Sequence, residues 1–437
     1  MALEFLKRKK AKTRVCVVGL DGVPHSMLER FCREGITPRM DAILRTGTHR
    51  RMKVTLPEIS AVSWPSFMTG VNPGTHGIYG FTDLKSGTYN MTFPSFRDLK
   101  APTFWDRLGE SKKRSVVINQ PSTYPARQIP GVLISGFVAI DLGRAVHPAV
   151  IKPLLEKWDY RIDIDTMKSR EDHEFLMKDL DRTLVGRERA FEYFWKEIDW
   201  DLFELVITGT DRIQHYLWSA IENESHAFHS RALEYYGKVD AFVGRIYDAF
   251  GDVSGTDGDG FFLLSDHGFT GIKQEVYLNR WLVQNGFLRF EKETPESLAD
   301  ISPDAKAFVM DPNRIYIHRR GRYPKGSVEA GELEKVKTEI RAGLEALEHD
   351  GEKVFFKIFD RGEVYSGPVV QDGPDLVAVG NYGFDVKGSP KETDLFKRTN
   401  LEGMHTWDDA FFWSKDATPE DLNITDLAGI ILKKLGA

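Results

Sequence analysis

The sequence predicts an α/β fold built on a mostly parallel central sheet. Six short segments are almost continuously apolar, which is typical of strands covered on both faces. Helical segments lie between them, and such alternation indicates a doubly wound arrangement. Of the 437 residues, 41% are hydrophobic and 28% charged, a composition that suits a large folded core.

The predicted elements follow one another along the chain. The strands are expected at 14–21, 115–119, 131–137, 202–209, 260–266 and 375–380. The helices are expected at 25–34, 38–46, 103–111, 149–157, 173–197, 226–250 and 330–347. We expect one domain over residues 14–437, with a smaller cap or insertion at about 286–370, where charge is denser, and a basic tail over residues 1–13.

Composition excludes several classes of protein. With 59 basic and 65 acidic residues the net charge is −6, which argues against a nucleic-acid binding surface. The N-terminal stretch "MALEFLKRKKAKTR" lacks the apolar region of a secretory signal, and no window reaches 18 consecutive apolar residues. Two cysteines cannot form a disulfide framework. We therefore predict a cytoplasmic protein without a transmembrane segment.

Carboxylates and histidines gather where the predicted strands end. In open α/β sheets, ligands bind beyond the carboxyl ends of the strands. A single Asp there is more often a helix cap or a turn residue, but together these residues are the ligand types that zinc and manganese prefer. Using all of them requires two metal ions. The set comprises Asp21, Asp211, His215, Asp266, His267 and, in a later Gly-flanked loop, His405.

The stretch "PEISAVSWPSFMTGVNPGTHGI", residues 57–78, offers three candidate nucleophiles, Ser60, Ser63 and Ser66. The stretch alone does not decide between them. Pro65 is best tolerated if the helix begins at Ser63 and Ser60 lies in the loop before it, since proline fits the first helical turn but not the interior.

The order of these motifs resembles the alkaline phosphatase superfamily. Within it, the chain is similar to the type I phosphodiesterase/nucleotide pyrophosphatase group, in the branch of predicted phosphohydrolases and phosphomutases. The resemblance rests on "GLDGV", residues 57–78, "VITGTDRIQHYLW", "LLSDHGF" and "EGMHTW" in this order. It implies a three-layer α/β/α sandwich that holds two divalent metal ions, Zn²⁺ as first choice and Mn²⁺ as second.

The resemblance also implies a role for each site residue. One metal is assigned to Asp21, the nucleophile, Asp266 and His267, and the other to Asp211, His215 and His405. In phosphodiesterases of the superfamily the nucleophile lies ten residues before the Gly of a Thr-Gly pair, which here leads to Ser60, with Ser63 as the alternative. Asn119 is a further candidate, as a donor to the substrate phosphate.

The resemblance implies a two-metal phosphodiesterase that acts on a small phosphate ester through a metal-activated serine and a phosphoserine intermediate. A phosphomonoesterase or a phosphomutase on the same scaffold is the second hypothesis. A binding protein with structural metals and no turnover is the third, although no ligand position is missing. Ser60 is followed by "AVSW", without the Pro and Arg of the sulfatase motif, so a sulfatase is disfavoured.

Overall fold

The computed structural model describes residues 13–437, and their packing divides into two compact units. The first unit comprises the chain up to Val71, Ser95–Phe269 and His405–Ala437. The second comprises Asn72–Pro94 and Thr270–Met404. The segment 286–370, expected to form a cap, falls inside the second unit. The tail predicted over residues 1–13 lies, except for its last residue, outside the described residues.

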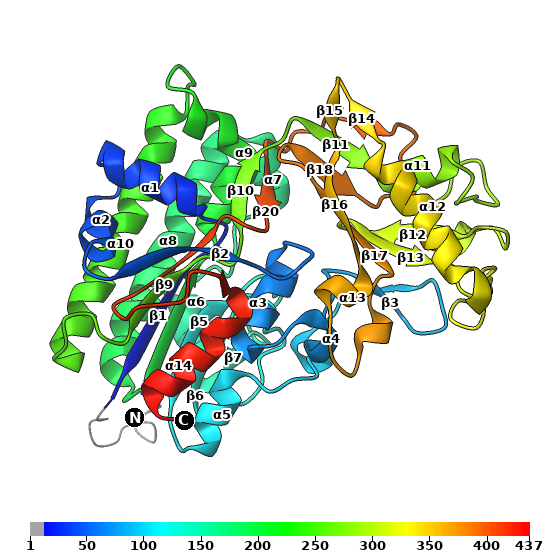
Figure 1. Ribbon diagram of the computed structural model, residues 1–437. Helices are drawn as coiled ribbons and strands as arrows, with labels where there is room; N and C mark the ends of the chain where they lie inside the picture. The colour runs from blue at the N-terminus through cyan, green and yellow to red at the C-terminus, as the bar shows by residue number, and fades with distance from the viewer. Residues whose placement is uncertain (1–12) are drawn as a thin grey trace. The chain divides into compact units, whose positions relative to one another are not determined.

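The first unit contains a nine-stranded sheet within the described residues (Figure 1). The five central strands run parallel, because β1 pairs with β8 and β9, and β5 pairs with β8 and β6, in parallel register. Antiparallel pairs occur toward the edges, at β2–β21, β21–β9 and β6–β7. In spatial order the strands are β22 (Leu422–Asn423), β2 (Thr48–Lys53), β21 (Ala410–Ser414), β9 (Phe261–Leu264), β1 (Val15–Leu20), β8 (Leu202–Ile207), β5 (Ser115–Gln120), β6 (Gly131–Ser135) and β7 (Val146–His147).

Helices cover both faces of this sheet, which makes the three layers that the sequence predicts (Figure 1). One face packs against α3 (Ser60–Thr69), α5 (Phe104–Glu110) and α14 (Leu427–Leu435). The helices of the other layer are α1 (His25–Glu34), α2 (Pro38–Leu44), α8 (His173–Glu197), α9 (Gly209–Glu222) and α10 (His229–Ser254), while α6 (Lys152–Lys157) and α7 (Thr166–Glu171) are short connecting helices.

Alternation along the strands explains why both faces must be covered. Val15 and Val17 of β1 belong to the same hydrophobic cluster as Trp64 of α3. On β8, Leu202 belongs to this cluster too, whereas the next residue, Phe203, points to the opposite face of the sheet and packs edge-on against Phe191 of α8. Successive side chains of a strand point to opposite faces, so strands that are apolar throughout bury two surfaces.

The second unit is built from smaller sheets and its own hydrophobic core. Its four-stranded sheet is antiparallel and consists of β12 (Ala307–Met310), β13 (Arg314–Ile317), β17 (Leu376–Gly380) and β16 (Phe355–Asp360). A three-stranded sheet contains β18 (Phe384–Lys387), β11 (Gln274–Tyr277) and β19 (Phe396–Lys397). Its helices include α4 (Pro73–His76), α11 (Leu278–Gln284), α12 (Leu333–Glu345) and α13 (Arg361–Val364), and short hairpins join β3 (Asp83–Leu84) to β4 (Met91–Thr92) and β14 (Glu348–His349) to β15 (Glu352–Lys353).

All six predicted strands form, but one belongs elsewhere. Residues 375–380 become β17, in the antiparallel sheet of the second unit rather than in the central sheet, so that assignment is wrong. An apolar run indicates burial and does not identify the sheet that provides it. Among the helices of the described chain, none combines the length and apolar character that crossing a membrane requires.

Candidate active site

Three neighbouring parallel strands place the predicted carboxylates at one edge of the sheet. Leu20, at the end of β1, is level with Ile207 of β8, and Gly19 is level with Leu264 of β9. Because these strands end together, the residues that follow them meet. Asp21 comes directly after β1, Asp266 comes two residues after β9, and Asp211 lies in the first turn of α9.

Helix α3 brings Ser60 to the same edge. Its hydroxyl donates to Asp21 Oδ1 at 3.3 Å and lies 3.1 Å from His267 Nε2. The helix begins at Ser60 itself, so the expectation that it begins at Ser63, with Ser60 in the preceding loop, is wrong. Pro65 is accommodated inside the helix, at the loss of one backbone hydrogen bond.

The other two serines of this stretch face different surroundings. Ser63 is fully buried, and its hydroxyl has no hydrogen-bond partner among the described residues. Ser66 Oγ donates to the Val62 carbonyl at 2.8 Å, a bond within its own helix. Ser60 is therefore the serine whose hydroxyl lies against the predicted metal ligands.

One group of ligand atoms surrounds His267 Nε2. This nitrogen lies 3.6 Å from Asp21 Oδ1, 3.4 Å from Asp266 Oδ2 and 3.9 Å from Asp211 Oδ1. Asp21, Asp211 and His267 each offer a ligand atom within 4.8 Å of the others, a spacing that can hold a metal ion. His267 Nδ1 donates to the Gly268 carbonyl at 3.0 Å, which leaves the Nε2 lone pair free for a metal.

A second group shares Asp211 with the first. Asp211 Oδ1 lies 3.4 Å from His215 Nε2 and 3.2 Å from His405 Nε2, and the two histidine nitrogens are 3.0 Å apart. His405 Nδ1 donates to the Glu58 carbonyl at 2.9 Å, so its Nε2 also presents a lone pair. Asp211, His215 and His405 lie close enough together to hold one ion, and Asp211 also belongs to the group around His267.

The electrostatics of the cluster favour cations. Burial raises the pKa of Asp21 well above its ordinary value, and the carboxylates of Asp266 and Asp211 add to the effect. Burial raises the pKa of Asp266 to about 7 and lowers that of His405 to about 3. Burial also acts to raise the pKa of Asp211, but the adjacent imidazoles and guanidinium hold it well below the ordinary value.

These observations test whether two metal ions fit. Three buried carboxylates repel one another, and burial lowers the pKa of His267 and of His405, so these two imidazoles are neutral. The donors are oxygen and imidazole nitrogen, with no thiolate, which is a set that Zn²⁺ and Mn²⁺ accept. The residues therefore fit two divalent cations.

Two residues hold the candidate ligands Asp21 and Asp211 in place, a role that the sequence alone does not assign to them. Trp64 Nε1 donates to Asp21 Oδ2 at 3.1 Å. Arg212 donates to Asp211 Oδ2 at 2.9 Å and is itself held by Asp163, with Nη2 2.7 Å from Asp163 Oδ2. Trp64 lies four residues after Ser60 on the same helical face, a spacing that is visible in the sequence. Asp163 lies 49 residues from Arg212, and no local pattern links them.

Asn119 lies at the end of β5 with a positive φ of 64°, a conformation that Asn tolerates better than most residues. Its amide donates to the Val206 carbonyl at 3.3 Å and to Thr208 Oγ1 at 3.4 Å. The amide protons are therefore engaged by β8 and by the residue that follows it, and binding of Asn119 to phosphate stays a prediction.

No curated protein sequence matches the chain significantly. Phosphonoacetate hydrolase from Sinorhizobium meliloti 1021, solved in complex with phosphonoacetate, shares 15% identity over 97% of this chain and 96% of that one, with a TM-score of 0.65. Murine ectonucleotide pyrophosphatase/phosphodiesterase 5 shares 14% identity over 97% and 95% of the two chains, with a TM-score of 0.55.

At such low identity these solved structures establish the fold, in agreement with the predicted alkaline phosphatase-like sandwich. The family model described as type I phosphodiesterase / nucleotide pyrophosphatase matches residues 15–408, which include every candidate metal ligand. The chain belongs to the type I phosphodiesterase / nucleotide pyrophosphatase family, whose members are metal-dependent phosphoric ester hydrolases.

Proposed function

We propose that this protein is a two-metal phosphodiesterase that uses Ser60 as its nucleophile. The observation that carries the proposal is the position of Ser60 Oγ, 3.3 Å from Asp21 Oδ1 and 3.1 Å from His267 Nε2. Ser60 is also the first residue of α3, and the N-terminus of a helix favours a bound phosphate.

In this proposal, Asp21, Ser60, Asp266 and His267 would hold one cation, and Asp211, His215 and His405 would hold the other. Zn²⁺ is the first choice and Mn²⁺ the second. The cations, when bound, would lower the pKa of the serine hydroxyl and neutralise charge on the transferring phosphoryl group.

The chain's own residues supply the covalent chemistry. Ser60 Oγ attacks phosphorus and releases its proton, while the bond from phosphorus to the leaving oxygen breaks and that oxygen takes up a proton to leave as an alcohol. The product is a phosphoseryl enzyme. Water then attacks phosphorus, the bond to Ser60 Oγ breaks, and the serine regains a proton. A diester substrate yields a phosphomonoester, and a monoester yields inorganic phosphate.

Helix α9 and its neighbours keep these groups in place. Arg212 holds Asp211 through one oxygen, which leaves the other facing His215 and His405. Trp64 does the same for Asp21, whose second oxygen faces Ser60. Fixed carboxylate orientation is what a site needs to position a nucleophile for in-line attack.

The test is a substrate comparison with metal control. The metal-stripped protein is assayed with a nitrophenyl phosphodiester, the matching monoester and phosphonoacetate, each with Zn²⁺, with Mn²⁺ and with EDTA. We expect metal-dependent turnover that favours the diester. Preference for the monoester would establish a phosphomonoesterase or mutase instead, and cleavage of phosphonoacetate would identify a carbon–phosphorus hydrolase.

Loss of all turnover in protein that still binds two metal ions would favour a non-catalytic, metal-stabilised binding protein. The proposed substrate is a small phosphate ester, and the net charge of −6 argues against a nucleic-acid substrate. The cytoplasmic location stays a prediction. Both cysteines within the described residues are free thiols, as a reducing compartment allows.

A further inference from the structure

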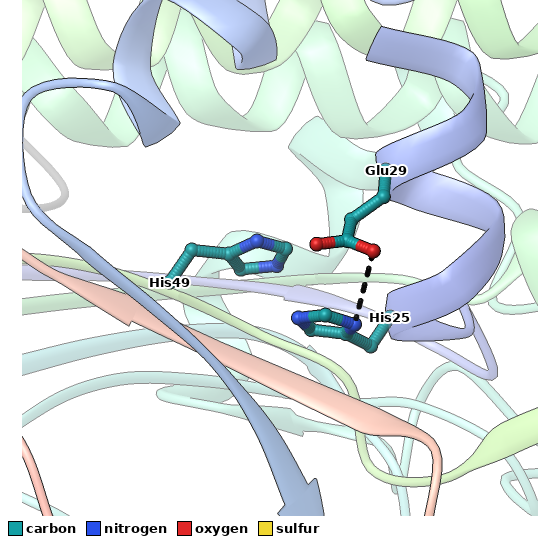
Figure 2. A group of neighbouring side chains, drawn as sticks. All are labelled: His25, Glu29 and His49. Carbon is teal, nitrogen blue, oxygen red and sulfur yellow. Dashed lines mark ion pairs between the residues drawn. The ribbon is translucent and has the colours of Figure 1, made fainter. Parts of the chain in front are cut away.

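A second cluster of potential metal ligands lies in the first unit, and it shares no residue with the active site. His25 and Glu29 project from the first turns of α1 toward His49, which comes from β2 (Figure 2). Each residue offers one ligand atom, and these atoms lie within 4.8 Å of one another. The family chemistry described above does not require any of the three.

The positions of the three residues follow from local structure. His25 and Glu29 are four residues apart on α1, so they share one helical face. His25 Nδ1 lies 3.8 Å from Glu29 Oε2. His49 is fixed in the ladder between β2 and β21, opposite Trp413. A helix and a strand that are separated in the sequence thus present their polar side chains to the same point.

Both imidazoles have buried nitrogens that lack a partner. His25 is 9% exposed, and neither His25 Nδ1 nor His49 Nε2 makes a hydrogen bond to any described residue. The rings stack at a centroid distance of 4.3 Å. Burial lowers the pKa of His49 to about 3 and also lowers that of His25, so both are neutral ligands at physiological pH. Two unpaired buried nitrogens are costly unless a ligand satisfies them.

The charges around the cluster leave Glu29 available. Arg51 Nε lies 3.1 Å from Asp409 Oδ1, and Ser26 also donates to that carboxylate, so these two charges compensate each other. Glu29 has 48% of its side chain exposed, so its carboxylate can move and water can reach the cluster. Apart from the two histidines, the cluster therefore contributes one free negative charge.

From this arrangement we infer that His25, Glu29 and His49 form a third divalent metal site, suited to Zn²⁺ with water as its fourth ligand. Two histidines and a glutamate are an established zinc ligand set. Tetrahedral ligands at Zn–N distances of about 2.1 Å are separated by about 3.4 Å, close to the 3.8 Å between His25 and Glu29. Closing the remaining distance requires rotation of one imidazole and a small shift of the half-exposed Glu29 side chain.

An ion held there would join α1 to β2. Helix α1 begins four residues after Asp21, and its first N–H donates to the Asp409 carbonyl in the loop after His405. The third ion would therefore stabilise the elements that carry two active-site ligands, without contacting substrate.

The test is metal titration of the stripped full-length protein with Co²⁺, followed by its visible absorption, and with Zn²⁺, followed by the metal retained after dialysis. We expect His49→Gln to bind one ion fewer per chain than the wild type. Glu29→Gln changes an exposed position that tolerates substitution, and it should lower the affinity for the same ion by at least tenfold. Both variants should keep phosphodiester turnover within about twofold.

Glu34→Gln, on the same helix but outside the cluster, is the matched control and should bind like the wild type. An unchanged number and affinity of ions in both His49→Gln and Glu29→Gln would overturn the inference. Parallel loss of turnover and metal in both variants would also overturn it, because the ion would then belong to the active site.

Discussion

Ser60 and Ser63 lie within one turn of α3, yet their side chains have different surroundings. We expect Ser60→Ala to lower kcat by at least about 10³-fold, because no other hydroxyl in this turn faces the metal ligands. Ser63→Ala should keep activity within a few-fold, since its hydroxyl contacts no described polar group. Steady-state kinetics on the phosphodiester, with metal content measured for both, distinguish them. Equal activity of the two variants would remove Ser60 from the mechanism.

Asp163 is joined to the candidate site through Arg212. Its carboxylate accepts hydrogen bonds from Nε and Nη2 of Arg212, and Arg212 in turn donates to Asp211. We expect Asp163→Asn to lower kcat/KM about tenfold and to raise the Zn²⁺ concentration needed for half-maximal activity, as for other residues that orient metal ligands.

Asp199→Asn is the matched control for this change, because Asp199 forms a similarly buried pair with Arg14 away from the site. A loss of activity that additional zinc does not restore, equal in the two variants, would show that only general destabilisation is at work.

At the residue scale, the sequence predicts the residue types of the site better than their partners. Asp21, Asp211, Asp266 and His267 follow strands, and strand ends are readable from apolar runs. The sharing of Asp211 by both groups of ligands was missed, because it depends on a side-chain position that spacing does not encode. Asp163 was missed because its contact with Arg212 arises only in the folded chain.

Strand β1 packs closely against α3, the helix that carries Ser60. A Cβ on Gly19 would lie 2.6 Å from Trp64 Cη2, and Trp64 is fully buried. We expect Gly19→Ala to destabilise the protein by about 1–3 kcal/mol through overpacking. Activity should fall as well, since Trp64 also orients Asp21.

Urea unfolding and kinetics on the same preparation test this expectation. Gly429→Ala is the control, because α14 has open space at that position and alanine favours a helix. Unchanged stability of Gly19→Ala would mean that the Trp64 side chain can shift away from the added methyl group with little loss of free energy.

Strand β8 carries a buried carboxyl group that makes stability depend on pH. Burial raises the pKa of Glu204 from 4.5 to about 8, with the Trp105 indole N–H offsetting part of the effect. The folded state thus holds a proton that the unfolded state releases above pH 4.5. Stability is therefore full below that pH and falls until about pH 8.

We expect Glu204→Gln to remove this slope. Relative to the wild type, the variant should gain on the order of 4 kcal/mol between pH 5 and pH 9, an upper estimate at about 1.4 kcal/mol per pKa unit. Urea midpoints of both proteins at the two pH values measure the difference. A difference that does not change with pH would mean that Glu204 ionises normally.

At the element scale, long periodic segments are the most predictable. Residues 25–34 and 173–197 are helical as expected, because their apolar spacing and flanking residues agree. Strand β2, "THRRMK", was not predicted, because its six residues are mostly polar and only Met52 is buried. Its place between β22 and β21 depends on partners near the other end of the chain.

For the molecule as a whole, metal ions are expected to stabilise the fold. Each ion at a concentration 100 times its dissociation constant adds about 2.7 kcal/mol. We expect EDTA to lower Tm by roughly 5 °C or more, and Zn²⁺ to restore it. Thermal scans in a Glu29→Gln background separate the active-site ions from the third one. An EDTA-insensitive Tm would contradict binding to the buried carboxylates.

The division into two units was not foreseen as such. The charge-rich segment 286–370 predicts a cap or insertion. Residues 72–94 belong to the same unit, although they lie far from that segment in the sequence. Composition reports local character, whereas the packing of distant segments into one core depends on tertiary contacts.

The order of strands in the central sheet bears on how the protein is made. Strand β21, residues 410–414, pairs with β2 on one side and β9 on the other, although both are synthesised much earlier. Until β21 is synthesised, β9 and β2 each have an unpaired edge, and unpaired strand edges are templates for aggregation. His405 emerges just before β21. A nascent chain thus gains the last of its candidate metal ligands at nearly the same moment as β21 pairs with β2 and β9, so completion of the candidate site coincides with protection from aggregation.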